Sequence, residues 1–356
     1  MNNSTSWLNN TTKVENIGSN AGGTMMVNYT HIVLYSILLL SSLLGNVLVI
    51  AVVFANRNLR TNFNHLIVNM AVSDLFIPLL ILPWKIVEGV NGSEWLVHGP
   101  LGQALCKLCI FFSDISPAVS VFSLVVVAVN RYMSIAHPMS SQVFSRKKSC
   151  VLISITWITS AVIFSPYFYT FSVTNDKQCK WTWWYPGGSD LAKNIFYWIV
   201  TATIFIIPLA AIIIMYSLMA YKIILNSKDI EKMLNDKQAR RRRGRNKNIF
   251  YVSIVIVCCF IFLWGPYHCL AVVFLTGNFS QSSEVTNTVI FVVQYLGYLN
   301  SAVNPCVYFI FLKHFRQGLR NLISGKKKSK DNSFTLLSSR RDTAHRLSKE
   351  NGKIES

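Results

Sequence analysis

Charged side chains are scarce in this sequence, and acidic ones are the scarcest. Asp, Glu, Lys and Arg make up 14% of the 356 residues, only 15 residues are Asp or Glu, and 52% of the chain is hydrophobic. Soluble domains of this length carry considerably more charge. The composition therefore argues against a soluble globular protein and indicates a chain that contacts lipid.

Three further absences narrow the class of function. Neither a paired nucleophile and base nor a cluster of metal ligands is visible, so we expect no enzymatic activity. The sequences of the two halves of the chain do not resemble each other, whereas many transporters contain internal repeats. A multispanning transporter therefore stays only as an alternative. The chain opens without a basic segment and a short apolar run, so we expect no cleaved signal peptide.

Long apolar segments are what the sequence has in abundance. Each of seven segments reaches or exceeds the roughly 20 residues that cross a bilayer as a helix, and a helix satisfies its own backbone polar groups in lipid. The sequence therefore predicts an all-α membrane protein built as a seven-transmembrane helix bundle. The segments cover roughly residues 31–54, 64–88, 103–136, 150–171, 194–222, 248–275 and 285–310.

The net charge of +19 is concentrated on one predicted side of the membrane. Of the 34 Lys and Arg residues, 28 lie in or beside the first, third and fifth connections, at the end of the third span, or in the C-terminal tail. Basic loops favour the cytosolic side, so we expect the N-terminus outside and the C-terminus in the cytosol. Nucleic-acid binding explains this uneven distribution poorly.

Glycosylation signals lie on the opposite predicted side. All seven Asn-x-Ser/Thr sequences fall in the N-terminal tail over residues 1–30 or in the second and sixth connections, whereas chance would place them on both sides. They agree with an extracellular N-terminus. The predicted glycosylation sites are Asn2, Asn3, Asn9, Asn10, Asn28, Asn91 and Asn278.

The eight cysteines do not form a disulfide scaffold. Most of them lie within predicted spans or face the cytosol, where thiols stay reduced. Cys106 opens the third span and Cys179 lies in the fourth connection, both on the predicted outer side, so we expect these two to form a disulfide. Cys109 is an alternative partner, although we interpret it as a buried thiol.

Almost every span carries a distinctive polar, aromatic or proline residue. Along the chain these are Asn46 in "GNVLVI", Asp74 in "NMAVSDLF", Arg131 placed 25 residues after Cys106, Trp157, Pro208 with Tyr216, Trp264 and Pro266 in "FIFLWGPY", and Asn304, Pro305 and Tyr308 in "NSAVNPCVY". This set, in this order, resembles the class A (rhodopsin-like) G-protein-coupled receptors, and the resemblance covers about residues 31 to 323.

The resemblance implies a multi-pass receptor of the plasma membrane that couples an extracellular ligand to a heterotrimeric G protein. It assigns G-protein coupling to Arg131, Tyr216 and Tyr308, and it implies arrestin and receptor kinases as further partners through the Ser/Thr-containing tail. The seven-transmembrane domain covers residues 31–310. Apolar and basic residues then alternate over 311–323, which predicts a short amphipathic helix on the inner leaflet before a disordered cytoplasmic tail over 324–356.

The middle of the predicted bundle holds an acid without an obvious cation. A carboxylate in the bilayer centre costs about 2.5–3.5 kcal/mol on insertion scales, so Asp74 should face the bundle interior. The resemblance implies a sodium ion bound by Asp74, Ser120, Asn300 and Asn304, with Ser301 beside them, and hard oxygen ligands suit a hard cation. The alternative is a protonated, hydrogen-bonded Asp74.

Arg131 lacks the acidic neighbours that relatives in this family use to restrain it. Asn130 precedes it, and Asn246 stands at the inner end of the sixth span, 20 residues before Pro266. We therefore expect a resting state that is restrained less by ion pairs. The alternative is that Asn130 and other hydrogen bonds restrain Arg131 well enough.

The ligand class follows from the outer halves of the spans. Amine receptors of this family carry an aspartate 18 residues before the arginine; here that residue is Ser113, with Asp114 beside it, so an amine or another small molecule stays an alternative. Retinal is excluded because residues 285–310 contain no lysine. Asp114 is expected to bind a basic group of the ligand, with a structural ion pair to Lys85 or Lys107 as the alternative.

The outer surface is rich in aromatic residues, which favours a short neuropeptide as the ligand. The fourth connection reads "CKWTWWYPGGSD" and could form a strand-like lid, although tryptophans also anchor proteins at membrane interfaces. His268 is interpreted as a wall of the pocket rather than a pH sensor. The predicted ligand-binding residues are Trp84, Asp114, Trp264, Tyr267, His268, Gln294 and Tyr298.

Overall fold

The computed structural model describes residues 6–92, 94–136, 146–182, 190–225, 237–275 and 284–324; within these ranges it does not describe the side chains of residues 6–28, 134–136, 146, 190–191, 223–225, 237–250, 274–275 and 284. Several predicted features lie outside this part of the chain. These are the glycosylation sites Asn2, Asn3 and Asn278, the side chains of Asn9, Asn10 and Asn28, and the cytoplasmic tail beyond Ser324.

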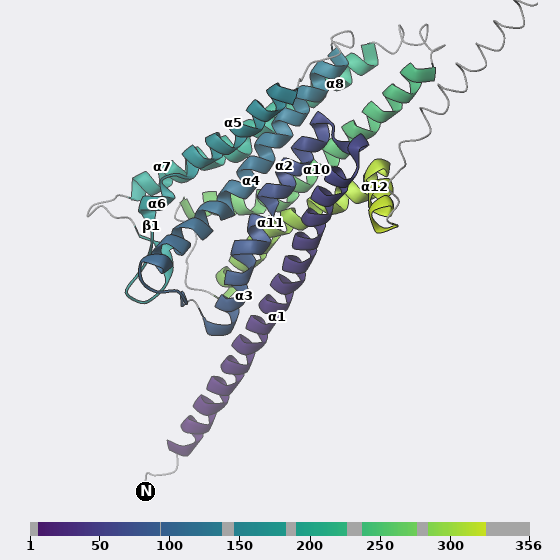
Figure 1. Ribbon diagram of the computed structural model, residues 1–356. Coiled ribbons are helices and arrows are strands. Elements are labelled where there is room, and N and C mark those ends of the chain that lie inside the picture. The colour runs from purple at the N-terminus through teal and green to yellow at the C-terminus, as the bar shows by residue number, and fades with distance from the viewer. Residues whose placement is uncertain are drawn as a thin grey trace, which may run out of the picture.

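Seven helical rods run side by side through the described part of the chain (Figure 1). Three of them are composite, because short α or π-helical segments continue the main helix. The rods are α1 (Ser6–Ala55); α2 (Asn62–Asp74) with η2 (Ile77–Ile81) and α3 (Leu82–Asn91); α4 (Gly99–Ala136); α5 (Arg146–Phe164) with α6 (Tyr167–Thr170); α7 (Asp190–Val200) with η3 (Thr201–Ile206) and α8 (Ile207–Leu225); α10 (Lys237–Leu275); and α11 (Glu284–Phe311).

The predicted seven-helix bundle is confirmed. Among the described residues, six rods are long and apolar enough to cross a membrane. The seventh, α11, is also long enough, but its polar residues, among them Gln294, Asn300 and Asn304, make it less apolar. Because α11 packs against both α1 and α10, those polar groups lie in a helix that protein covers on two sides.

α1 begins earlier than expected. The sequence predicts a tail over residues 1–30, whereas the helix starts at Ser6 and projects beyond the bundle, with its apolar span beginning at Tyr29 (Figure 1). Extending an existing helix adds one hydrogen bond for each residue fixed, which is far easier than nucleating a new one. The polar segment can therefore continue a helix that the apolar span has already formed.

Two spans contain a π-helical turn next to a proline. Pro78 lies inside η2, and Pro208 is the second residue of α8, which follows η3. Proline cannot donate the backbone hydrogen bond of a regular α-helix, and a wider turn accommodates that loss. A turn with one extra residue rotates all later side chains by about 100° relative to a continuous α-helix.

Polar side chains inside the bundle tie helices together. The indole Nε1 of Trp157 donates to Asn69 Oδ1 at 2.8 Å, and Asn69 Nδ2 donates to Ser123 Oγ at 2.9 Å, which links α5, α2 and α4. Asn46 Nδ2 on α1 donates to the Ser301 carbonyl of α11 at 2.9 Å. Such bonds give these polar groups the hydrogen-bond partners that lipid chains do not offer.

One end of the bundle, called here the hairpin end, carries a two-stranded antiparallel sheet. β1 (Phe171–Val173) pairs with β2 (Cys179–Trp181), so that Val173 lies opposite Cys179. Cys179 forms a disulfide with Cys106 at the start of α4, as expected, and Cys109 is a buried free thiol. The Gln103 side chain donates to the Val173 carbonyl and accepts from the Val173 backbone N–H. The hairpin is therefore fixed to α4.

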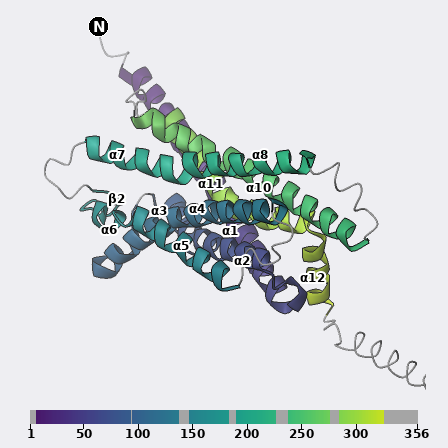
Figure 2. The same ribbon diagram turned by 90° about the horizontal axis from the view of Figure 1, so that it is seen from above.

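The opposite end, called here the α12 end, carries α12 (Lys313–Ile323), which lies across the ends of the other helices (Figure 2). It begins two residues later than expected because Leu312 is extended and breaks the helix after α11. Phe315 is fully buried, and the backbone of Gly318 approaches α1 so closely that a Cβ there would lie 2.7 Å from Val52. The predicted amphipathic helix is confirmed.

Candidate functional site

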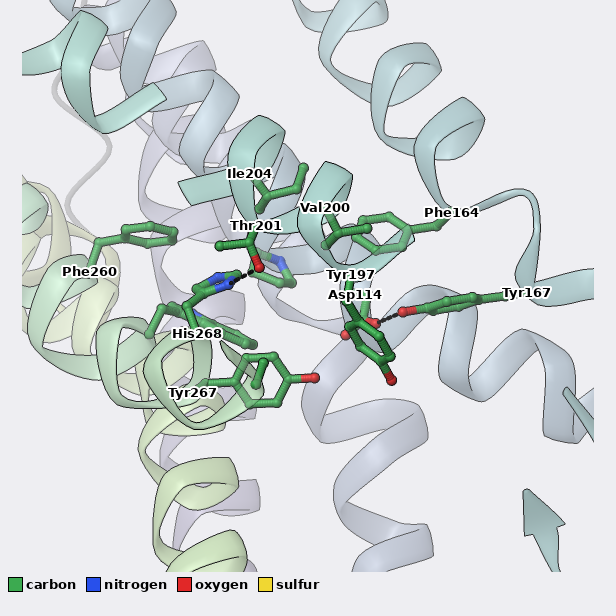
Figure 3. Close-up of a pocket in the computed structure, with 13 residues that line it drawn as sticks. Asp114, Phe164, Tyr167, Tyr197, Val200, Thr201, Ile204, Phe260, Tyr267 and His268 are labelled. Atoms are coloured by element: carbon green, nitrogen blue, oxygen red, sulfur yellow. Dashed lines mark hydrogen bonds between the residues drawn. The ribbon is translucent and has the colours of Figure 1, made fainter. Parts of the chain in front are cut away.

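A cavity lies between α4, α6, α7, η3 and α10, within the half of the bundle that ends in the hairpin (Figure 3). In Figure 3, Phe260, Tyr267 and His268 reach in from one side, and Phe164 and Tyr167 from the other. The cavity has a volume of about 30 Å³, which is room for about two water molecules. Its lining consists of Asp114, Pro117, Phe164, Tyr167, Tyr197, Val200, Thr201, Ile204, Phe260, Trp264, Tyr267, His268 and Ala271.

Asp114 is the acidic group of this cavity. Its Oδ2 accepts a hydrogen bond of 2.6 Å from the phenol of Tyr167, which is drawn in Figure 3. The structural ion pair offered by the sequence is absent: among the described residues Asp114 forms no ion pair, and Lys85 pairs with Glu88 at 2.7 Å instead. A carboxyl group accepts through two oxygens and about four lone pairs, so one hydroxyl leaves acceptor capacity for a ligand.

Three of the other predicted ligand-binding residues line the same cavity. Tyr267 and His268 follow Trp264 on α10, and His268 Nδ1 lies 3.4 Å from Thr201 Oγ1. The His268 ring stacks on Phe205 with centroids 4.6 Å apart, consistent with its interpretation as a wall.

Trp264 lies at the base of this group and is 6% exposed. Its six-membered ring rests on Gly297 of α11, where a Cβ would come within 3.3 Å. Its indole Nε1 finds no hydrogen-bond partner among the described residues. A buried indole N–H normally has a partner, so Trp264, a residue of the cavity wall, holds a donor without a described partner, beside an acid with spare acceptor capacity.

The remaining predicted ligand-binding residues do not line the cavity. Trp84 packs edge to face on Trp95 with centroids 5.2 Å apart, and the ammonium of Lys85 lies 4.8 Å from its ring. Tyr298 packs towards Tyr35 of α1, and Gln294 lies half-buried one turn away on α11. Trp84 and Tyr298 pack against one apolar cluster near the hairpin end, which also contains Tyr35 and Leu82.

The sequence reasoning did not assign nine of the lining residues to the ligand site, among them Phe164, Tyr167, Tyr197 and Thr201. One signal could have found Tyr167: Ser165 and Pro166 mark a break at the end of the fourth span, where a side chain can turn inward. Trp181 of β2 lies 5.9 Å from both Tyr167 and Tyr197, measured between ring centroids. The first part of the predicted lid, β2, is therefore a strand that contacts the cavity wall, whereas residues 183–189 of the lid lie outside the described residues.

The predicted sodium site is compact. Asp74 is 1% exposed; its Oδ1 accepts from Ser120 Oγ at 3.1 Å and its Oδ2 from Asn304 Nδ2 at 2.9 Å. Ser73 Oγ lies 3.3 Å from Ser120 Oγ, and Asn300 is buried on α11. A carboxyl group flanked by two hydroxyls is a set of hard oxygen ligands, which fits a sodium ion.

The three residues assigned to G-protein coupling lie towards the α12 end. The guanidinium carbon of Arg131 lies 4.5 Å from the ring centroid of Phe63, and Tyr216 packs against the apolar cluster that contains Phe63. Tyr308 is nearly fully buried, and its phenol contacts the sulfur of Met70 at 3.8 Å.

Comparison with known proteins agrees with this geometry. The family model described as "7 transmembrane receptor (rhodopsin family)" matches residues 45–308. Among curated proteins, the chain is 26% identical over 304 residues to the QRFP-like peptide receptor of Branchiostoma floridae, covering 82% of this chain and 77% of that one.

Two further relatives are similar over comparable lengths. Neuropeptide FF receptor 1 of Homo sapiens is 28% identical over 307 residues, covering 81% of this chain and 69% of the relative. The cholecystokinin receptor of Xenopus laevis is 25% identical over 357 residues, covering 83% and 77%. The family match spans most of the chain and includes Asp74, Arg131, the Cys106–Cys179 disulfide and at least part of each of the seven helical rods. The chain therefore belongs to the rhodopsin family of seven-transmembrane receptors and is a multi-pass membrane protein, not an enzyme.

Proposed function

We propose that this chain is a cell-surface receptor for a short peptide that presents a basic group, and that it transmits peptide binding to a heterotrimeric G protein. The observation that carries the proposal is Asp114, a half-buried acid within a membrane span whose described hydrogen-bond partner is a single phenol. An ionisable residue within a membrane span is expensive and indicates a functional site. The relatives are named as receptors for peptides, which favours a peptide over other basic ligands.

The surroundings of Asp114 favour a cation. Tyr167, Tyr197 and Tyr267 lie around it in the cavity lining, and aromatic faces attract ammonium and guanidinium groups within about 6 Å. The cavity is too small for a whole ligand in this conformation, so one basic side chain or terminus would enter and widen it. The unused indole N–H of Trp264 would then meet a hydrogen-bond acceptor on the same ligand.

The second candidate ligand is a biogenic amine. The small cavity with one acid favours it, because a short amine needs less space than a peptide. Against it, amine receptors of the family place their aspartate where this chain has Ser113. A screen that contains both short peptides and amines decides between the two ligand classes.

Further roles belong to the same proposal. The N-terminus would be extracellular, with glycans on the predicted asparagines, and the C-terminus cytosolic, with α12 on the inner leaflet and the tail available to kinases and arrestin. Asp74, Ser120, Asn300 and Asn304 would hold an allosteric sodium ion. Arg131, Tyr216 and Tyr308 would contact the G protein.

The test is a screen of short amidated peptides and of amines on cells that express the receptor with a panel of G-protein reporters. We expect peptides containing Arg or Lys to activate at least one reporter. Asp114→Asn keeps an oxygen for the Tyr167 hydrogen bond but removes the charge. A charge-assisted hydrogen bond contributes about 1.5–3 kcal/mol, so potency for the basic peptide should fall about 10- to 100-fold.

The matched control is Asp176→Asn, which removes an exposed acid that pairs with Lys180 on the hairpin. It should leave potency within about fivefold, because exposed ion pairs contribute at most about 1 kcal/mol. A neutral analogue of the peptide should be nearly insensitive to Asp114→Asn. Equal losses for the basic and neutral analogues would contradict recognition by Asp114, and activation by amines alone would replace the peptide with an amine.

A further inference from the structure

Arg131 lies over an aromatic ring. Its guanidinium carbon is 4.5 Å from the ring centroid of Phe63, within the roughly 6 Å over which cations attract ring faces. The two residues come from different helices, α4 and α2, and lie 68 positions apart in the sequence. Phe63 is not one of the motif residues that mark the family in this sequence.

The ring of Phe63 is held in a fixed place. Thr61 caps α2 by accepting a hydrogen bond of 3.3 Å from the backbone N–H of Asn64, and the Asn64 side chain donates to the Leu59 carbonyl at 2.6 Å. Phe63 itself is 8% exposed and belongs to the apolar cluster that also contains Leu124 and Val127 of α4. The ring therefore cannot follow Arg131 when the arginine moves.

The sequence supplies no acid beside Arg131, since Asn130 precedes it. We propose that Phe63 positions Arg131 in the resting receptor through a cation–π contact, at the point of the chain where a carboxylate would otherwise act. The contact stabilises the resting orientation of the guanidinium and is lost when Arg131 turns towards the G protein. This inference rests on the proposed coupling to a G protein, but not on the identity of the ligand.

The first experiment measures ligand-free signalling at matched surface density. Phe63→Leu keeps apolar bulk but removes the ring, and a cation–π contact corresponds to about a three- to tenfold rise in basal output. Phe63→Tyr keeps the ring and should stay within twofold of the wild type. Adding Asn130→Asp to Phe63→Leu should bring basal output back down, because the new carboxylate replaces the ring as a partner.

A control separates this role from general loss of packing. Phe76→Leu removes a phenyl ring that stacks on Phe112, away from Arg131, and should leave basal output unchanged. Unchanged output for Phe63→Leu, or an equal rise for Phe63→Tyr, would overturn the inference.

A second measurement needs no G protein. In purified receptor, Phe63→Leu should lower the melting temperature in the wild-type background. It should have a smaller effect in the Arg131→Gln background. Equal effects in both backgrounds would overturn the contact itself. A clear coupling between the two substitutions, together with no reporter response in any cell line, would keep the contact and count against the proposed G-protein function.

Discussion

The two acids within the bundle differ, since Asp74 is fully buried and Asp114 is half-buried. Asp74 receives a hydrogen bond on each carboxyl oxygen, from Ser120 of α4 and Asn304 of α11. Asp114 receives one, from Tyr167, and lies in a cavity. A buried polar group with all its partners stabilises a unique arrangement, whereas one with spare acceptors is available to a ligand. An aspartate therefore links helices in the centre of the bundle, at Asp74, and is available to a ligand near the hairpin end, at Asp114.

The largest effect is expected from loss of the Cys106–Cys179 disulfide, which fixes the hairpin beside the Asp114 cavity. Replacing Cys106 or Cys179 by Ala frees β2 from α4 and with it Trp181, which packs against Tyr167 and Tyr197. We expect loss of surface delivery or of ligand binding, measured by cell-surface staining and by the peptide response. Cys109→Ala is the control and should change neither. Normal binding by both disulfide variants would show that the hairpin does not support the cavity.

Asp74→Ala should destabilise the receptor more than Asp114→Ala does. It leaves the donors of Ser120 and Asn304 without their partner, and an orphaned buried group costs about 1–3 kcal/mol. Thermal unfolding of the detergent-solubilised protein measures the difference. Asp74→Asn, which keeps one acceptor oxygen, should lie between the wild type and Asp74→Ala. A larger loss for Asp114→Ala would reverse the contrast between the two acids.

Tyr167→Phe tests the contrast between Asp74 and Asp114 by removing the one described hydrogen bond of Asp114. It removes the hydroxyl that binds Asp114 and leaves the aromatic packing, so the net loss of stability should be about 1 kcal/mol, typical of one hydrogen bond. Basic peptides should bind at least as well as before, because the carboxyl group loses a competitor. Dose–response curves measure this, with Tyr169→Phe, on the exposed side of α6, as the control. A tenfold loss of potency would place Tyr167 itself in contact with the ligand.

The smallest expected effect concerns sodium. If Asp74 and its hydroxyl neighbours hold the ion, replacing sodium chloride by choline chloride at constant ionic strength should raise basal signalling about two- to fivefold, at or below the lower end of the usual coupling energies of about 1–3 kcal/mol. Asp74→Asn should abolish this dependence, while Asp114→Asn should keep it. A dependence that survives Asp74→Asn would place the cation elsewhere.

Much of the bundle was predictable from local features. Length and apolarity marked all seven spans, and charge in the loops singled out Cys106 and Cys179 as the outward pair. The cavity was predicted only in part: Asp114, Trp264, Tyr267 and His268 line it, whereas Trp84, Gln294 and Tyr298 do not. The π-helical turn η2 lies between Asp74 and Trp84, and its extra residue rotates Trp84 away from the direction that regular helical counting gives.

The sequence by itself determined which segments enter the membrane, because burying a helix in lipid depends on the sum of its own side chains. It also determined that Arg131 has Asn130, not an acid, as its neighbour. Only the tertiary structure decided which partners these polar residues have. Tyr167 meets Asp114 across 53 positions, and Phe63 meets Arg131 across 68, because helix packing brings together side chains whose spacing along the chain carries no periodic signal. Membrane insertion is a local property of each segment, whereas recognition and restraint arise from contacts between segments.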